Sequence, residues 1–161
     1  NQGITTSVPV IVFCEKENIS KERLYRGLMA SNLIAIYQKY YIGKLSAFCG
    51  AVSAGSAAAC GIGYLIGLEE EKIECILTNA LATSGGIVCD GAKASCASKI
   101  AVALDNGLLA LEMAKRGIQF EYMDGIVGSC CDTTVKNIGK MAREGMKDTD
   151  DKILEIMLEQ N

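Results

Sequence analysis

Eight cysteines are the most reactive groups in this chain of 161 residues, which contains no histidine. Lack of histidine excludes an imidazole base, a Ser–His or Cys–His nucleophile and a histidine-ligated metal. Cys49, Cys89 and Cys96 differ from the other cysteines because each stands beside glycine or turn residues at the end of an expected element. The turn at residues 90–91 folds the chain back between Cys89 and Cys96, and a helix N-terminus near Cys96 favours the thiolate that binds metals. The spacing alone neither establishes nor excludes a metal or iron–sulfur site, because Cys-x6-Cys with a distant third cysteine is not a standard ferredoxin spacing.

The remaining five cysteines are weaker candidates for chemistry. Cys14, Cys60 and Cys75 lie among apolar residues of expected helices. A free cysteine there behaves as a small hydrophobic group, so core packing is the favoured interpretation. Cys130 and Cys131 are neighbours in an expected loop, where a redox or metal role is open. Adjacent cysteines cannot form an unstrained disulfide with each other, so no disulfide is expected between Cys130 and Cys131.

Two further patterns could bind ligands, and each also has a structural explanation. Gly61, Gly63 and Gly67 form a Gly-x-Gly-x3-Gly string that departs from the dinucleotide fingerprint by one residue and follows no expected strand. Helix packing is therefore the favoured interpretation of these glycines. Acidic runs at residues 69–71 and 148–151 could bind a divalent cation, and helix capping explains them equally well.

Composition limits the classes of protein to consider. The 16 basic and 19 acidic residues give a formal net charge of −3, so the basic face that nucleic-acid binding requires is missing. Cysteines placed mostly in apolar, helix-like stretches favour a reducing compartment, and we expect a cytoplasmic protein. The most apolar stretch, residues 51–68, is shorter than the ~20 residues of a membrane-spanning helix, so no membrane segment is expected.

Apolar residues recur at helical spacing almost throughout, which predicts an all-α fold and a single domain over residues 1–161. Ser20 is expected to cap a helix whose apolar face is formed by Leu24, Leu28, Leu33, Ile34 and Tyr37. The small residues of 50–67 predict a central, buried helix around which the others pack. We expect about seven helices, at residues 4–17 (with Pro9 as a kink or first turn), 21–41, 50–67, 69–84, 93–116, 132–144 and 149–159.

Four strings of the chain resemble one known family. They are FCGAVSAG (48–55), GIVCDGAKASCASKIA (86–101), the opening NQGITTSVPV and GMKDTDDKIL near the end. These strings are similar to the C-terminal half of the serine-dehydratase-alpha-like family. That family includes iron–sulfur L-cysteine desulfidases and is related to the iron–sulfur L-serine dehydratases. The cysteine spacings of forty and seven residues resemble those of the desulfidase branch.

The resemblance implies a cofactor and a set of site residues. Cys49, Cys89 and Cys96 match three ligands of a [4Fe–4S] cluster whose fourth iron is open to substrate. The opening Asn1-Gln2-Gly3 matches a glycine-rich loop on the substrate side, which implies Asn1 and Gly3 as substrate-binding residues. The N-terminal half of the family, which carries further active-site residues, is absent from this chain. We therefore expect the chain to be the C-terminal part of a longer lyase and to be inactive alone.

The expected function is elimination of sulfide or water from L-cysteine or L-serine, which yields pyruvate and ammonia. An open iron would act as a Lewis acid on the leaving group while a base removes the α-proton. The base is not identified: Lys93 and Lys99 lie near the cysteine loop, and Asp90 is expected to shape the turn or orient a ligand. The expected partners are the amino-acid substrate and the missing N-terminal half, with homo-oligomerisation left open. A cluster-free helical assembly module and a cysteine-ligated zinc domain are the alternatives.

Overall fold

The computed structural model of the chain describes residues 2–159, and these residues form an all-α domain. The predicted fold class is confirmed, because the described residues contain no strand and pair as β-structure only at an isolated bridge between Phe48 and Val88. A π-helical turn, η1, joins the last two helices. The elements are α1 (Gln2–Lys16), α2 (Lys21–Ile42), α3 (Gly50–Leu65), α4 (Glu70–Ser84), α5 (Ser95–Lys115), α6 (Cys131–Lys140), η1 (Met141–Gly145) and α7 (Lys147–Glu159).

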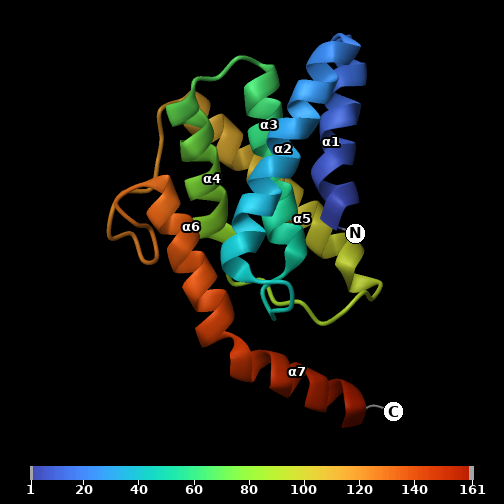
Figure 1. Cartoon of the computed structure of the whole chain (residues 1–161), viewed down its shortest axis with the longest axis vertical. Helices are drawn as coiled ribbons and strands as arrows, with labels where there is room; N and C mark the ends of the chain where they lie inside the picture. The colour runs from blue at the N-terminus through green and yellow to red at the C-terminus, as the bar shows by residue number, and fades with distance from the viewer. Residues whose placement is uncertain (1, 160–161) are drawn as a thin grey trace.

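Helix α3 is the central element, as its small residues predict. It contacts α1, α2, α4 and α5 (Figure 1), and of its residues only Gly50 and Tyr64 are not buried. A methyl group on Gly61 would lie 2.8 Å from the Ser31 Cβ on α2, so this glycine serves helix packing rather than a nucleotide loop. Over residues 2–159 no helix is both long and apolar enough to cross a membrane.

Helices α3 and α5 cross in close backbone contact. A Cβ atom on Gly55 would lie 2.6 Å from the Ala103 carbonyl carbon, and one on Gly107 would lie 2.7 Å from the Gly55 carbonyl oxygen. No side chain fits at such distances, so glycine at both positions lets the two backbones touch. This contact fixes the position of α5, whose first turn carries Cys96.

Replacing Ala58 with leucine is expected to destabilise the core. Ala58 is fully buried in α3, and the added atoms would overpack the interior by about 1–3 kcal/mol. Urea unfolding of the full-length protein measures the loss of stability. The control is Ala101→Leu at an exposed position of α5, where a change within about 0.5 kcal/mol is expected. Equal stability of the two variants would contradict the central position of α3.

Helix α2 follows the prediction at its ends and departs from it along its face. The Ser20 hydroxyl accepts a hydrogen bond from the Arg23 backbone N–H at 3.4 Å, and Gly43, with φ +97°, ends the helix. Leu33 does not join the apolar face, because its side chain is 60% exposed. The buried face ends at Ile42 and otherwise carries small or polar residues, which allow close approach to α3: Gly27, Ser31, Ala35 and Gln38.

Other helix boundaries differ from prediction by a few residues. Helix α1 begins at Gln2 and continues through Pro9, and α5 begins at Ser95. The single helix expected at 132–144 is divided into α6 and the π-helical turn η1. Beyond η1, helix α7 extends away from the bundle and has no buried residue (Figure 1).

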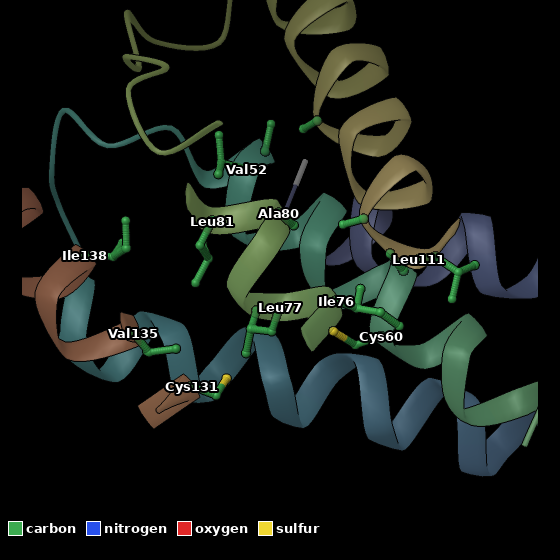
Figure 2. Packing of buried hydrophobic residues seen from close by; sticks show 14 of the residues in the cluster. Val52, Cys60, Ile76, Leu77, Ala80, Leu81, Leu111, Cys131, Val135 and Ile138 are labelled. Atoms are coloured by element: carbon green, nitrogen blue, oxygen red, sulfur yellow. The ribbon is translucent and has the colours of Figure 1, made fainter. Parts of the chain in front are cut away.

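Buried aliphatic residues of α3, α4 and α6 interlock to form much of the core (Figure 2). Cys60 of α3 belongs to this core, and its complete burial raises the pKa of its thiol. Cys14 and Cys75 are also buried, at 2% and 3% exposure. The prediction that these three cysteines act as small hydrophobic groups is therefore confirmed by their packing.

Candidate functional site

Cys49 and Cys89, forty residues apart in sequence, are brought side by side by two loops that pair for a short stretch. The Cys49 backbone N–H donates to the Ile87 carbonyl at 3.0 Å, and the Cys89 N–H donates to the Ala47 carbonyl at 2.6 Å. Cys49 is the N-cap residue of α3 and is only 2% exposed, whereas Cys89 is half-buried. Both loops lie at the same end of the bundle (Figure 1).

The loop before α5 brings Cys96 back toward Cys89. Gly91 has φ +87°, a conformation that favours glycine, and this turn reverses the chain. Across the turn, the Lys99 ammonium contacts the Asp90 carboxylate at 2.5 Å. The Cys96 thiol also lies 3.5 Å from the Gly91 carbonyl oxygen. Asp90 therefore shapes the turn by joining the Cys89 loop to the first turns of α5.

The three candidate cysteines line one cavity of about 160 Å³. The other lining residues are mostly small or apolar, and no carboxylate or amine is among them: Gln2, Thr5, Gly50, Ala51, Gly91, Ala92 and Ile100. Segments far apart in sequence thus present three thiols to a common space.

The three thiols of this cavity can be compared with the ligand sets of known metal sites. Within residues 2–159, no three side chains of Cys, Asp or Glu come together at the spacing that one ion needs. A four-iron cluster needs a wider spacing of its ligand sulfurs, because each cysteine binds a different iron. Structural zinc sites have four protein ligands, whereas this cavity offers three thiols.

Charge around the thiols is dominated by one ion pair. Burial raises the pKa of the Cys49 thiol, and the nearby Lys99 ammonium partly offsets this effect. Its hydrogen bond to Asp90 raises the pKa of Lys99, while the same contact lowers the pKa of the Asp90 carboxyl. Lys99 is therefore held as an ammonium, which makes it a poor base and a favourable neighbour for thiolates. Lys93, the other lysine near this loop, is exposed and does not line the cavity.

Replacing Asp90 with asparagine is expected to loosen the cysteine loop without unfolding the domain. Asparagine keeps the size of the side chain but loses the charge that holds Lys99 at 2.5 Å. Residues that orient metal ligands typically change metal affinity by about 10–100-fold, so iron should leave the variant about tenfold faster during chelator challenge. Asp105→Asn, at an exposed position further along α5, is the matched control. Equal iron release from Asp90→Asn and the wild type would contradict this role.

Of the two predicted substrate-binding residues, Asn1 lies outside the described residues, and Gly3 lies in the first turn of α1 rather than in a loop. Gly3 lines a second cavity, of about 250 Å³, together with Gln2 and Lys39. Sequence reasoning missed both Gln2 and Lys39. The signal available for Lys39 was its position one turn after Ala35, because this i, i+4 spacing puts it near the buried face of α2.

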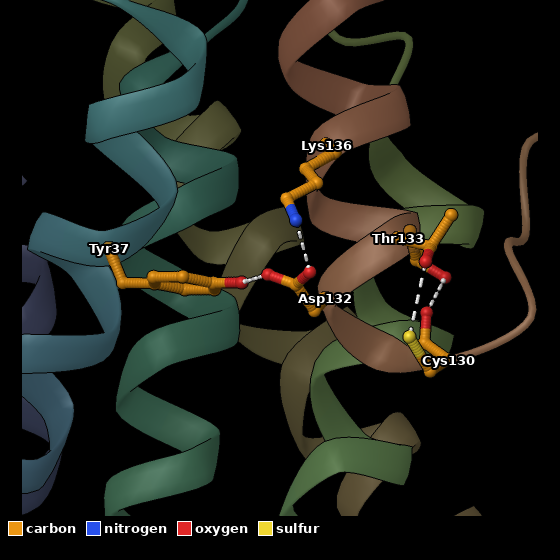
Figure 3. A network of polar contacts seen from close by, with 6 residues as sticks. Tyr37, Cys130, Asp132, Thr133 and Lys136 are labelled. Atoms are coloured by element: carbon orange, nitrogen blue, oxygen red, sulfur yellow. Dashed lines mark hydrogen bonds and ion pairs between the residues drawn. The ribbon is translucent and has the colours of Figure 1, made fainter.

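Cys130 and Cys131 are separate from the three-cysteine cavity. Cys130 is exposed, and its hydrogen-bonded contact with the Thr133 hydroxyl, 3.1 Å away, lowers the pKa of its thiol. Cys131 is buried, and burial raises its pKa to about 11. The next residue, Asp132, accepts a hydrogen bond from Tyr37, which ties α6 to α2 (Figure 3). It also pairs with Lys136 one turn further along α6.

The acidic runs occupy helix starts. Glu69 is the N-cap of α4, Glu70 and Glu71 lie in its first turn, and Asp148 and Asp150 lie in the first turn of α7. Negative charge at these positions stabilises the positive helix end. The described residues contain no carboxylate cluster at metal-binding spacing, and the helix dipole gives both runs a structural role.

The fold and the cavity define an all-helical domain that presents three thiols, contributed by separate segments, at one end of its bundle. The chain belongs to the serine dehydratase alpha chain family, whose model matches residues 1–155.

Several similar curated proteins have the name UPF0597 protein. A UPF0597 protein of Finegoldia magna is 46% identical over 99% of this chain, and one of Lachnoclostridium phytofermentans is 49% identical over 98%. The chain spans 38% of the length of each of these relatives. No solved structure matches the chain.

Proposed function

We propose that the chain is the cluster-carrying part of a lyase that eliminates sulfide from L-cysteine or water from L-serine. The observation that carries the proposal is the convergence of Cys49, Cys89 and Cys96 on one cavity. Membership of the serine dehydratase alpha chain family supports a lyase-type reaction. The eight cysteines are all free thiols, which agrees with a reducing, cytoplasmic setting.

The three thiolates would hold a [4Fe–4S] cluster, which supplies a Lewis acid for the leaving group when bound. Around them, the first turn of α3 presents backbone N–H groups that have no partner inside the helix. The positive end of this helix and the Lys99 ammonium both favour negative charge in the cavity. Ala51, Ala92 and Ile100 give the same space an apolar lining.

The reaction balances as a β-elimination. A base takes the α-proton, the electron pair of that C–H bond forms the new double bond, and the β-carbon bond to sulfur or oxygen breaks. The aminoacrylate product hydrolyses to pyruvate and ammonia. No carboxylate or amine of residues 2–159 lines the three-cysteine cavity, so we assign the base to the part of the longer protein outside this chain. The length of the relatives supports such a part.

The test is a substrate panel on the full-length protein, prepared without oxygen and reconstituted with iron and sulfide. Pyruvate and ammonia should form from L-cysteine, with release of sulfide, or from L-serine, and the D-enantiomers should give neither. The isolated chain of 161 residues, reconstituted in the same way, should be inactive. Failure of every small L-amino acid with a full-length protein that holds its iron would overturn the lyase proposal. Zinc in place of iron would support the structural alternative.

A further inference from the structure

A second cavity lies next to the three-cysteine cavity and shares one wall with it. Its volume is about 250 Å³, and it is formed between α1 and α2. Gln2 lines both cavities, which makes it the residue common to the two spaces. The remaining lining residues are Gly3, Thr6, Asn32, Ala35, Ile36 and Lys39. These described residues include no carboxylate, and the only charged group that they contribute is the Lys39 ammonium.

Lys39 is a half-buried cation without a counter-charge in the part of the chain that the structure describes. Its side chain forms none of the ion pairs found among residues 2–159. Partial burial of an ammonium without an anion is costly, because the group loses water and gains no partner. Burial accordingly lowers the pKa of Lys39, and the thiol of Cys89 is the group that opposes this shift.

Gln2 adds a second unused donor at the shared wall. Its amide nitrogen is buried and has no hydrogen-bond partner among the described residues. The amide oxygen lies against the start of α3, 3.5 Å from the position that a Cβ atom on Gly50 would take. A buried donor without a partner is uncommon in folded proteins and calls for an acceptor.

The other polar groups of the cavity already have partners. The Thr6 hydroxyl donates to the Gln2 carbonyl at 2.9 Å. The Asn32 amide donates to the Leu28 carbonyl at 2.8 Å and to the Ser7 hydroxyl at 3.2 Å. Gln2 and Lys39 are thus the two groups of this cavity that remain available to a ligand.

We propose that the cavity lined by Gln2 and Lys39 binds the α-carboxylate of the amino-acid substrate, whose side chain then reaches the three-cysteine cavity. An ammonium and an amide N–H complement the two oxygens of a carboxylate, which is a pure acceptor. The shared wall puts the carboxylate and the reacting end of one small molecule in adjoining spaces. This inference rests on the proposed function, because it takes the substrate to be an amino acid.

The subsite is tested by calorimetric titration of the full-length protein with L-alanine and L-alaninamide. Neither probe has a leaving group, so binding is measured without turnover, and only L-alanine carries a carboxylate. The wild type should bind L-alanine more tightly. Lys39→Met should weaken L-alanine binding by about ten- to hundredfold and abolish the preference, because a hydrogen bond to a charged partner is lost. Lys39→Arg should retain most of the preference.

Lys21→Met, at an exposed position of the same helix, is the matched control and should bind both probes as the wild type does. Circular dichroism and melting temperature establish that each variant is folded, and Gln2→Leu gives an independent variant that should weaken L-alanine binding. A wild type that binds the two probes equally, or a folded Lys39→Met that keeps the preference, would overturn the subsite. If Lys39→Met loses the preference for L-alanine but the wild type shows no lyase activity, the subsite is retained and the lyase proposal is rejected.

Discussion

Alanine at Cys49, Cys89 or Cys96 is expected to abolish the visible absorption of the cluster and the lyase activity of the full-length protein. Each change removes one thiolate from the cavity that all three line, and no fourth cysteine lines it as a substitute. The helical fold should persist, because cysteine to alanine deletes a single sulfur atom at a helix end or in a loop. Iron content, visible absorption and pyruvate release measure the effect.

Cys14, Cys60 and Cys75 provide the matched controls for this experiment. They are buried in the helical core rather than in the cavity. Alanine at these positions should cost about 1 kcal/mol of stability each for a lost buried group and leave iron content unchanged. Full iron content in Cys89→Ala, or loss of iron in Cys60→Ala, would contradict the assignment of the ligands.

Phe48→Ala is expected to cause the largest loss of stability among the changes considered and to disturb the site as well. Phe48 is 1% exposed and is the largest fully buried side chain of the described core. Truncation of a buried phenylalanine to alanine typically costs about 3–5 kcal/mol. Because Phe48 pairs with Val88 and immediately precedes Cys49, the same change should loosen the two cysteine loops and accelerate iron loss.

Leu45→Ala is the control within the same loop. Leu45 is 93% exposed, so its truncation should change stability by less than about 0.5 kcal/mol and leave iron release unaltered. Urea unfolding and chelator challenge of both variants separate the two expectations. If Phe48→Ala released iron no faster than Leu45→Ala, the bridge would not be what positions Cys49 and Cys89.

Helix positions were predictable because the signals for them are local. The spacing of apolar residues predicted the helices, Ser20 predicted the start of α2, and the small residues predicted the central α3. The exposed Leu33 shows where that reasoning failed: it assumed that large apolar residues mark the buried face. Close contact with α3 instead selects small residues such as Gly27 and Ser31 on α2.

From the sequence, only Cys89 and Cys96 could be placed close to each other, because a turn lies between them. The pairing of Phe48 with Val88, which brings Cys49 to the same cavity, is a long-range contact without a local signal. Lys39 was missed for a related reason, since a lysine near the end of a helix is usually solvated. Its importance depends on the cavity formed with the start of α1, a whole helix earlier in the chain.

The most direct test of the central claim is Mössbauer spectroscopy of the full-length protein reconstituted with isotopically enriched iron. Three cysteine ligands predict about four irons per chain in one cluster, with one iron spectroscopically distinct from the rest. Addition of the substrate amino acid should change the signal of that iron alone. A spectrum in which all irons are equivalent and none responds to the amino acid would contradict the claim that Cys49, Cys89 and Cys96 hold a cluster with an open iron.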